Sequence, residues 1–407
     1  MPPKIFMIGM YHLGCVNTAC LSSFGYEITC FDFDKEVINN LSKGIFPIKE
    51  DGVPEYFKKQ SNRIHYSKNI KDAEKNDFIF ITYDIEANGI KIDIIDKIIE
   101  KLKPYIKNQI IIVRSQVPVG TCDKIKEQLN TEVCYIPENL QLGKSIRNFL
   151  FPGWMVLGVS SKKIKKQVMD LFNNVPGIKK FMKLKEAEMT KHAMNCYLAT
   201  IISFSGEISD ICEKMHIDAK QILSTLRLDK RVGHSSPIMP GLGFSGGTIE
   251  RDLYTIIKNN QTSVIDAVYW YNKKRGWYIL NKLEELLGNL DHKKITFFGA
   301  TYKAGTDTLR DSPTVTIIER LQKYTCNIRV YDPLVKKGIK GVRFIEPDES
   351  MGSDAIIIMT DYDEFKDINY NKLKPKLIID TKGILPKIIK HYEIGVPYGK
   401  SSSHHGR

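Results

Sequence analysis

Two short groups of residues in the middle of the chain have the types and spacing that could support chemistry. In PGLGFSGGTIERD at 240–252, four of the first eight residues are glycine, which lets a main chain approach a ligand more closely than any side chain would allow. Upstream, Lys191 and Asn195 are four residues apart and share a face if the segment is helical. Taken alone, each group has a plainer interpretation, because loops collect glycine for turn geometry and most lysines are solvated.

A third group, near the N-terminus, has the spacing of a dinucleotide-binding site. An apolar strand at 4–8 precedes the turn GMYHLG at 9–14 and a small-residue helix, and a second strand at 27–31 ends in Asp32, 23 residues after the first glycine. Such a turn lets a pyrophosphate sit on a helix N-terminus, and the acid accepts hydrogen bonds from ribose hydroxyls. Tyr11 replaces the second glycine, which normally leaves room for the pyrophosphate. Tyr11 either moves the cofactor outward, points away from it, or marks a loop that no longer binds one, and the pattern as a whole favours a dinucleotide site over a structural unit.

The elements that must position these residues alternate between strands and helices, which predicts a mostly parallel, doubly wound sheet. Further strands are predicted at 78–81, 109–113, 133–136 and 154–158, with a helical stretch at 93–102. In such a sheet, ligand groups gather in the loops after the carboxyl ends of the strands. The loops SQVPVGT at 115–121 and PENLQLG at 137–143 qualify.

The rest of the chain predicts a helical centre and a second α/β domain. Residues 186–215 form one apolar-striped helix that could bridge two domains and offer a dimerisation surface. Strands are then predicted from Lys294 (ITFFG) and at 328–331, 354–359 and 377–380. We therefore expect an α/β fold with two Rossmann-like doubly wound domains, at 1–185 and 289–397, joined by a central helical region at 186–288 and followed by a polar tail at 398–407.

Composition and charge narrow the class of protein. With 407 residues, of which 42% are hydrophobic and 26% charged, the chain is long enough for two or three globular domains. The net charge of +13 comes from dispersed lysines without a basic block interleaved with aromatics, which disfavours nucleic acid and suits anionic small molecules such as nucleotides. No apolar run reaches the roughly 18 residues that span a membrane, and the N-terminus predicts a strand rather than a signal peptide.

The eight cysteines show no CxxC pair and no zinc-type spacing with histidine, so we expect no metal site. Several of them lie in apolar strand or helix patterns. This distribution predicts buried free thiols in a reducing cytoplasm.

Seven motifs, in order along nearly the whole chain, resemble those of the UDP-glucose/GDP-mannose dehydrogenase family. They are the strand-turn-helix with Asp32, VPVGT at 117–121, PENLQLGKSI at 137–146, the Lys191/Asn195 helix, LDKRVG at 228–233, GFSGGTIERD at 243–252 and KAGTDTLRDSP at 303–313. The resemblance implies an N-terminal NAD-binding domain, a central helical region that forms a homodimer and a C-terminal nucleotide-sugar-binding domain. It also implies an enzyme that oxidises the C6 hydroxyl of a nucleotide sugar twice, with two NAD, to a uronic acid.

The resemblance also places catalytic groups on this sequence. The family's helix lysine and asparagine fall on Lys191 and Asn195, its loop acid on Glu138 and its aspartate on Asp252. The family's nucleophilic cysteine captures the intermediate aldehyde as a thiohemiacetal, so that a second hydride can leave. That cysteine falls on Thr248.

The threonine is the most informative departure from the family pattern. A thiol has a reference pKa near 8.5 and is partly thiolate at neutral pH, whereas an alcohol has essentially no alkoxide. Cys196 follows Asn195 directly, and folding could bring its thiol to the site instead. Three further departures are Gln116 and Leu142 in the two loops, and Arg251, where the family has lysine. Together they indicate a divergent branch of the family.

The remaining site assignments also follow from the resemblance. The cofactor NAD is assigned to Gly9, Tyr11, His12, Leu13, Gly14, Asp32 and Arg310, and the nucleotide sugar to Arg231, Phe244, Gly246, Gly247 and Lys303. NAD is expected rather than NADP, because the carboxylate of Asp32 would repel a 2′-phosphate.

Three functions stay open on the sequence. The first is a single NAD-dependent hydride transfer that gives a sugar aldehyde or ketone, in which Lys191 and Asp252 handle the proton and a bound water and Asn195 polarises the developing oxyanion. The second is the full oxidation to a uronic acid through a hydrated aldehyde, with Glu138 or Asp252 activating the water. The third is a binding protein that keeps the nucleotide-sugar pocket without turnover.

Overall fold

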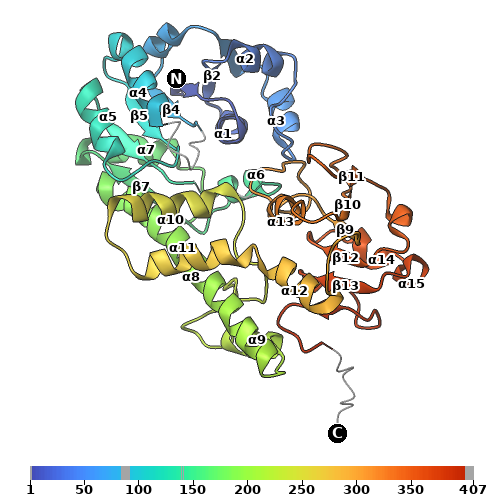
Figure 1. Cartoon of the computed structure of the whole chain (residues 1–407). Coiled ribbons are helices and arrows are strands. Elements are labelled where there is room, and N and C mark those ends of the chain that lie inside the picture. Colours follow the sequence, from blue (N-terminus) through green and yellow to red (C-terminus); the bar gives the residue numbers. More distant parts are fainter. Residues whose placement is uncertain (1, 84–91, 139, 141, 399–407) are drawn as a thin grey trace. The chain divides into compact units, whose positions relative to one another are not determined.

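The computed structural model describes residues 2–83, 92–138, 140 and 142–398 (Figure 1). The chain divides into two compact units, Met1–Met194 and Asn195–Arg407, which we call unit 1 and unit 2. Of the predicted polar tail, residues 399–407 lie outside the described part. None of the described helices is long and apolar enough to cross a membrane.

Unit 1 is built on an eight-stranded sheet in the order β3-β2-β1-β4-β5-β6-β7-β8, parallel except for the β6/β7 pair. The order reverses between β1 and β4, which is the switch point where ligands bind in doubly wound sheets. The strands are β1 Lys4–Ile8, β2 Glu27–Phe31, β3 Ile64–Ser67, β4 Phe78–Ile81, β5 Ile110–Val113, β6 Val133–Tyr135, β7 Trp154–Val159 and β8 Ile178–Met182.

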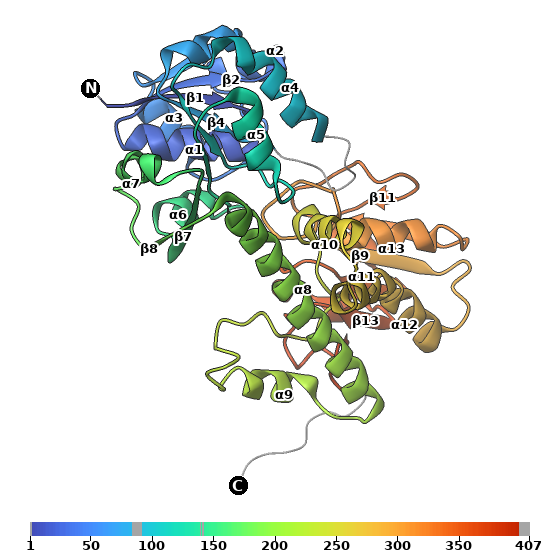
Figure 2. The same cartoon turned by 90° about the vertical axis from the view of Figure 1, so that its left-hand side faces the viewer.

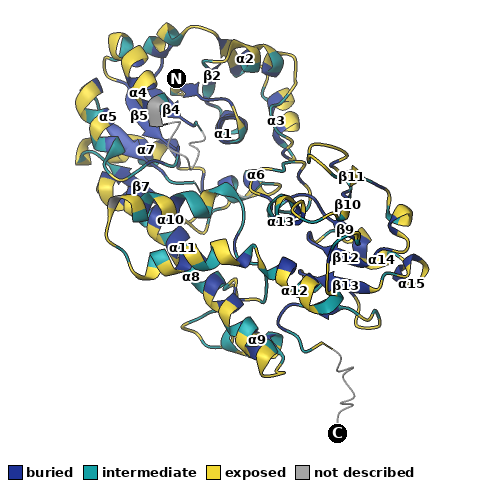
Figure 3. Cartoon of the chain, in the orientation of Figure 1, coloured by how far each residue is buried: buried dark blue, intermediate teal, exposed yellow. Residues whose placement is uncertain are grey.

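Helices cover both faces of this sheet because successive strand residues point to opposite sides. In β1, Ile5 and Met7 pack into one apolar layer and Phe6 and Ile8 into the other, so this central strand is buried on both faces. Figure 3 shows where buried and exposed residues lie along the ribbon. The first layer holds α1 His12–Ser23, α2 Lys35–Ser42, α3 Val53–Lys59, α6 Ser145–Leu150 and α7 Lys165–Leu171, and the second holds α4 Ile92–Leu102 and α5 Thr121–Leu129. Short 3-10 turns lie at η1 Ile70–Lys75, η2 Lys103–Tyr105 and η3 Lys162–Ile164.

The turn between β1 and α1 depends on two glycines. Gly9 has a φ of +98°, which L side chains rarely adopt, and its N–H donates to the Phe31 carbonyl at 3.0 Å. A Cβ on Gly14 would overlap the Gly9 carbonyl oxygen. The two glycines therefore let α1 begin directly over the end of β1.

A single long helix, α8 Leu184–Lys214, begins in unit 1 and continues into unit 2 (Figure 2). The predicted helix at 186–215 is thus confirmed, and it runs through Gly206 without a break. A Cβ on Gly206 would come within 2.8 Å of the Tyr271 hydroxyl, so the glycine serves close helix packing.

Unit 2 contains a parallel six-stranded sheet in the order β11-β10-β9-β12-β13-β14 and several further helices. The strands are β9 Lys294–Phe298, β10 Asn327–Tyr331, β11 Arg343–Phe344, β12 Ala355–Ile358, β13 Leu377–Asp380 and β14 Tyr392–Glu393. The helices are α9 Ala219–Leu226, α10 Gly247–Asn259, α11 Val264–Arg275, α12 Tyr278–Leu287, α13 Pro313–Leu321, α14 Glu364–Asp367 and α15 Tyr370–Leu373, with the 3-10 turn η4 Pro347–Ser350. Two doubly wound sheets and a helical region confirm the predicted fold class.

The four strands that the sequence did not predict share one property, since β3, β8, β11 and β14 are the edge strands of the two sheets. An edge strand is paired on one side only and does not need the continuous apolar run of a central strand. In β8, for example, Lys179 and Lys180 occupy the middle of the strand, and β3 exposes His65 and Tyr66.

We expect the substitution Gly14→Ala to destabilise the chain strongly, because its new methyl group overlaps the Gly9 carbonyl and either the turn or α1 has to move. The free energy of unfolding, measured by urea titration, should fall by about 2–4 kcal/mol. Gly153→Ala is the matched control, since Gly153 has open space around its Cβ position. Equal stability of the two variants would contradict this account of the turn.

Candidate active site

Asp32 lies at the carboxyl end of β2 with only 7% of its surface exposed. Its Oδ2 accepts a hydrogen bond from the Met10 N–H at 2.7 Å, so the carboxylate fixes the turn that follows β1. Its Oδ1 accepts from the Asp34 N–H at 3.0 Å and from the Tyr83 hydroxyl at 2.7 Å. The predicted ribose acceptor is therefore in place beside the glycine turn, and Tyr83 is a neighbour that the sequence did not predict.

Tyr11 is the N-cap residue of α1 and is 40% exposed. Its φ of −89° and ψ of −150° are ordinary extended values, so this position does not need glycine for its main-chain conformation. His12 and Leu13 follow in the first turn of α1, with Leu13 buried in the core. The α1 N-terminus is thus free of a side-chain cap, as a pyrophosphate site requires.

Glu50, which the sequence did not identify, ties the first turn of α1 to the loop before α6. The His12 Nε2 donates to its carboxylate at 2.8 Å, and the Gly143 and Ser145 N–H groups donate at 2.9 and 3.1 Å. Burial acts to raise the pKa of Glu50, but the hydrogen bonds from His12 and the two amides outweigh it and hold that pKa below its usual range. No sequence pattern distinguishes Glu50 from neighbouring charged residues.

The loop SQVPVGT at 115–121 is held by the start of α8. Glu188 accepts from the Gly120 N–H at 2.6 Å and the Cys122 N–H at 2.8 Å, which caps α5. His192 forms a 3.0 Å hydrogen bond with the Val117 carbonyl. Lys191, between these two anchors in sequence, is only 8% exposed. The interpretation of Lys191 as a solvated surface residue is therefore wrong.

Glu138, predicted on the loop after β6, forms an ion pair with Arg114. Arg114 directly follows β5 and is buried between the rings of Phe149 and Phe172. The ion pair therefore holds the Glu138 carboxylate next to a buried guanidinium. The position of Arg114 at the carboxyl end of a predicted strand was the available sequence signal for it.

In unit 2, the Asn195 side-chain amide donates a hydrogen bond to the carboxylate of Asp252. Asp252, in α10, is fully buried, and the Arg251 guanidinium lies 3.6 Å from its second oxygen. Two residues that the sequence placed 57 positions apart thus meet, and they form a buried polar pair.

Side chains of α11 form hydrogen bonds with the main chain of the glycine-rich loop before α10. Asn272 exchanges two 3.0 Å hydrogen bonds with the main chain of Phe244, and Arg275 donates to the Gly241 carbonyl. The Phe244 side chain is buried in an apolar cluster. Loops of this kind form a ligand site only if their main chain is fixed, and here two side chains fix it.

The same loop lies against the segment that follows β9. A Cβ on Gly246 would be 3.5 Å from the Tyr302 ring, and one on Gly247 would be 2.5 Å from the Asp311 carboxylate. The structure therefore brings the predicted glycines next to the predicted KAGTDTLRDSP motif, in which Lys303 is partly exposed and Arg310 exposed. Arg231 is also exposed and pairs with Asp229.

Thr248 is exposed in the first turn of α10, four residues before Asp252. Cys196, the alternative nucleophile, is buried in the apolar cluster with Phe244 and Leu253. Burial, followed by the charge of Asp252, raises the pKa of the Cys196 thiol to about 11. At that pKa roughly one thiol in ten thousand is thiolate at pH 7.

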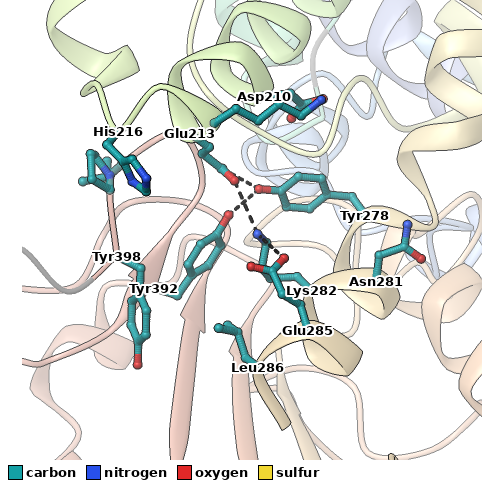
Figure 4. Close-up of a pocket in the computed structure, with 13 residues that line it drawn as sticks. Asp210, Glu213, His216, Tyr278, Asn281, Lys282, Glu285, Leu286, Tyr392 and Tyr398 are labelled. Carbon is teal, nitrogen blue, oxygen red and sulfur yellow. Dashed lines mark hydrogen bonds and ion pairs between the residues drawn. The ribbon is translucent and has the colours of Figure 1, made fainter. Parts of the chain in front are cut away.

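Two cavities in unit 2 differ in what their walls offer. One of about 230 Å³ is bordered by the glycine-rich loop, the end of α11 and the start of α13. A larger one of about 580 Å³ lies between the end of α8, α12 and residues 392–398 (Figure 4). Several of its polar groups are paired with one another, since Tyr278 bonds to Glu213 and Tyr392, and Lys282 to Glu285. We therefore place the candidate site at the glycine-rich loop.

The substitution Glu50→Gln should lower stability at neutral pH and flatten its acid dependence. A carboxylate with a depressed pKa stabilises the folded state above its unfolded pKa, near 4.3, and loses that contribution as the pH falls through the lower folded value. Urea unfolding between pH 3 and 7 should show a loss of about 1–3 kcal/mol at pH 7 that shrinks below pH 4.3. Glu100→Gln, at a 72% exposed side chain, is the control, and a pH-independent loss in Glu50→Gln would contradict the prediction.

Comparisons with known proteins cover most of the chain. Three models of the UDP-glucose/GDP-mannose dehydrogenase family match: the NAD binding domain at residues 3–176, the central domain at 185–274 and the UDP binding domain at 296–387. UDP-glucose 6-dehydrogenase of Rickettsia conorii is 31% identical over 94% of this chain and 95% of its own. UDP-glucose 6-dehydrogenase YwqF of Bacillus subtilis is 30% identical over 89% and 88%.

Solved structures agree in fold. The UDP-glucose dehydrogenase from Pyrobaculum islandicum superposes with a TM-score of 0.89 at 22% identity, covering 98% of both chains. The UDP-D-ManNAc dehydrogenase from Pyrococcus horikoshii gives 0.86 at 21% identity, covering 96% of this chain and 99% of its own. This chain therefore belongs to the UDP-glucose/GDP-mannose dehydrogenase family and is an NAD-dependent nucleotide-sugar dehydrogenase.

Proposed function

We propose that this dehydrogenase removes one hydride from a CH–OH carbon of a UDP- or GDP-hexose and releases a sugar aldehyde or ketone. In this reaction the carbon loses hydride and the hydroxyl loses a proton, and the products are the carbonyl compound, NADH and H⁺. When bound, NAD supplies the hydride acceptor. Lys191 and Asp252 handle the proton and a bound water, and Asn195 stabilises the developing oxyanion.

The proposal rests on one combined observation: position 248 carries an alcohol, and the thiol of Cys196 is buried. Thr248 is exposed at the N-terminus of α10, where main-chain N–H groups favour a developing negative charge but where no thiolate can capture an aldehyde. Cys196 is shielded in the apolar cluster, with a pKa near 11. We therefore infer that turnover stops after the first oxidation.

The residues around the switch point fit NAD. Asp32 has acceptor capacity at the end of β2, Gly9 and Gly14 bring the main chain close, and the α1 N-terminus lacks a side-chain cap. Tyr11 extends into solvent from this turn, so we infer that it lies beside the pyrophosphate. In unit 2, Phe244 and the glycines at 246 and 247 shape the sugar site, Lys303 meets the nucleotide sugar, and Arg310 meets the cofactor.

The alternative is a complete oxidation through a hydrated aldehyde, for which the Arg114–Glu138 pair is the specific support. Arg114 holds the Glu138 carboxylate in place, and in this route Glu138 takes a proton from the water that adds to the aldehyde. The resulting diol then loses a second hydride and a proton to give the acid. A binding protein without turnover is the remaining alternative, and it has no comparable support.

The ratio of NADH formed to sugar consumed decides between these functions. With a panel of UDP- and GDP-hexoses and mass identification of the product, we expect a ratio near one and an aldehyde or ketone. A ratio near two with a uronic acid would establish the hydrated-aldehyde route. Absence of NADH together with tight nucleotide-sugar binding would establish the binding protein.

A thiol restored at position 248 should change that ratio. We expect Thr248→Cys to raise NADH per sugar from near one toward two, because a cysteine there can form the thiohemiacetal that the second hydride transfer needs. Thr248→Ser is the matched control, since it changes size without adding a thiol, and should stay near one. If both variants give the same ratio, the residue at 248 does not limit the reaction.

We also propose a homodimer that packs through α8. Tyr197, Phe204 and Ile211 follow a seven-residue spacing, which places them on one helix face, and they are 55%, 46% and 47% exposed. Phe204→Glu should yield monomers by light scattering, whereas Met239→Glu, at an exposed loop position outside α8, should leave the dimer intact. A monomeric wild-type protein would contradict the proposal.

The state of the cysteines supports the expected location in the cytoplasm. All eight thiols are free, and seven of them are buried. Such a set suits a reducing compartment, where disulfides do not form.

A further inference from the structure

The carboxylate of Asp32 has fewer acceptor positions left than its proposed role needs. An ionised carboxylate offers about four lone-pair positions, two on each oxygen. The described residues fill three of them: the Met10 N–H takes one on Oδ2, and the Asp34 N–H and the Tyr83 hydroxyl take both on Oδ1. One position, on Oδ2, therefore remains for a ribose that carries two adjacent hydroxyls.

Unit 2 contains a similar aspartate at the end of its second strand, but main-chain N–H groups take the place of the tyrosine. Asp332, at the end of β10, accepts from the Ala300 N–H in the turn after β9, and its Oδ1 accepts from the N–H groups of Leu334 and Val335. Main-chain amides thus saturate Oδ1 of Asp332 permanently. In Asp32 a side-chain hydroxyl holds one of these positions, and a side chain can leave it by rotation.

Tyr83 is placed where it must interfere with a ligand of Asp32. Its ring carbon Cδ2 lies 2.8 Å from the point where a Cβ on Gly9 would be, so the ring covers the glycine turn. The ring also stacks on Phe33, whose N–H donates to the Tyr83 hydroxyl at 3.1 Å. Burial, followed by the charge of Asp32, raises the pKa of Tyr83 far above its usual value, so the hydroxyl remains a donor at all working pH values.

We propose that the Tyr83 hydroxyl occupies the Oδ1 position that the adenosine ribose of NAD requires, so that cofactor binding displaces Tyr83 and Tyr83 sets the affinity for NAD. The inference rests on the proposed role of Asp32 as the ribose acceptor. When NAD binds, a ribose hydroxyl replaces the Tyr83 hydroxyl on Oδ1 of Asp32. The number of hydrogen bonds to that oxygen does not change, so this hydroxyl adds little to the affinity for NAD. Removal of the tyrosine hydroxyl removes this competition.

The first test compares dissociation constants for NAD in four proteins by calorimetry. Tyr83→Phe should bind NAD roughly tenfold more tightly than wild type, because a hydrogen bond to a charged group no longer has to break. Tyr105→Phe is the matched control. Tyr105, in η2, precedes β5 and so lies at the amino-terminal ends of the strands, whereas Asp32 lies at the carboxyl ends. Unchanged or weaker NAD binding by Tyr83→Phe would overturn the inference.

The fourth protein, Asp32→Asn, separates this inference from the function on which it rests. Loss of at least tenfold in NAD affinity supports Asp32 as the ribose acceptor, and the Tyr83 result then tests the inference alone. Unchanged affinity in a folded Asp32→Asn variant would overturn the role of Asp32, and the inference with it.

Dinucleotides that lack the 2′ or the 3′ hydroxyl of the adenosine ribose give a second test, which is run on wild type and on Tyr83→Phe. The analogue that lacks the hydroxyl meant for Oδ1 leaves Tyr83 in place, so it should bind wild type within twofold of NAD. For that analogue, Tyr83→Phe should bind no more tightly than wild type. If both analogues bind wild type tenfold more weakly than NAD, or the gain is equal for all three ligands, Tyr83 does not compete with the ribose.

Discussion

Parallel strands end in loops whose main-chain N–H groups have no partner in the sheet, and buried carboxylates satisfy them throughout this protein. In unit 1, Asp32, Glu50 and Glu188 each accept two main-chain hydrogen bonds from such loops or turns. In unit 2, Asp332 and Asp380 each accept three. An unpaired buried N–H costs about as much as a lost hydrogen bond, so these acids fix the loops at the ends of the strands.

This constraint shapes the chemistry of the N-terminal site. A carboxylate that holds a turn has few acceptor positions left for a ligand, and Asp32 has to serve both purposes. The tyrosine beside it completes the coordination of the carboxylate when no ribose does so, which keeps a buried charge satisfied at the expense of affinity. Binding of a dinucleotide is then an exchange of partners, with little net gain in hydrogen bonds.

The same physical reasoning applies to the start of α10. Asn195 and Asp252 form a buried pair whose hydrogen bond fixes both side chains. Asn272 and Arg275 hold the loop that leads to Asp252. Thr248 is exposed at the N-terminus of the same helix and offers an alcohol there. The proposed single oxidation rests on this alcohol, because an alcohol does not capture an aldehyde as a thiol does.

The sequence alone predicted the fold class, the central strands of both sheets and the place of Asp32, because apolar runs and glycine spacing are local patterns. Its resemblance to a family added Asn195, Asp252 and Thr248 to the candidate site. The edge strands escaped it, since they bury too little apolar surface to leave a pattern. Tertiary structure alone decided which side chains support those positions. Tyr83 and Glu50 have no distinctive neighbours in sequence, and Arg114 is marked only by its position after a predicted strand. Their contacts arise because parallel strands bring distant loops together, where a buried charge must find a partner.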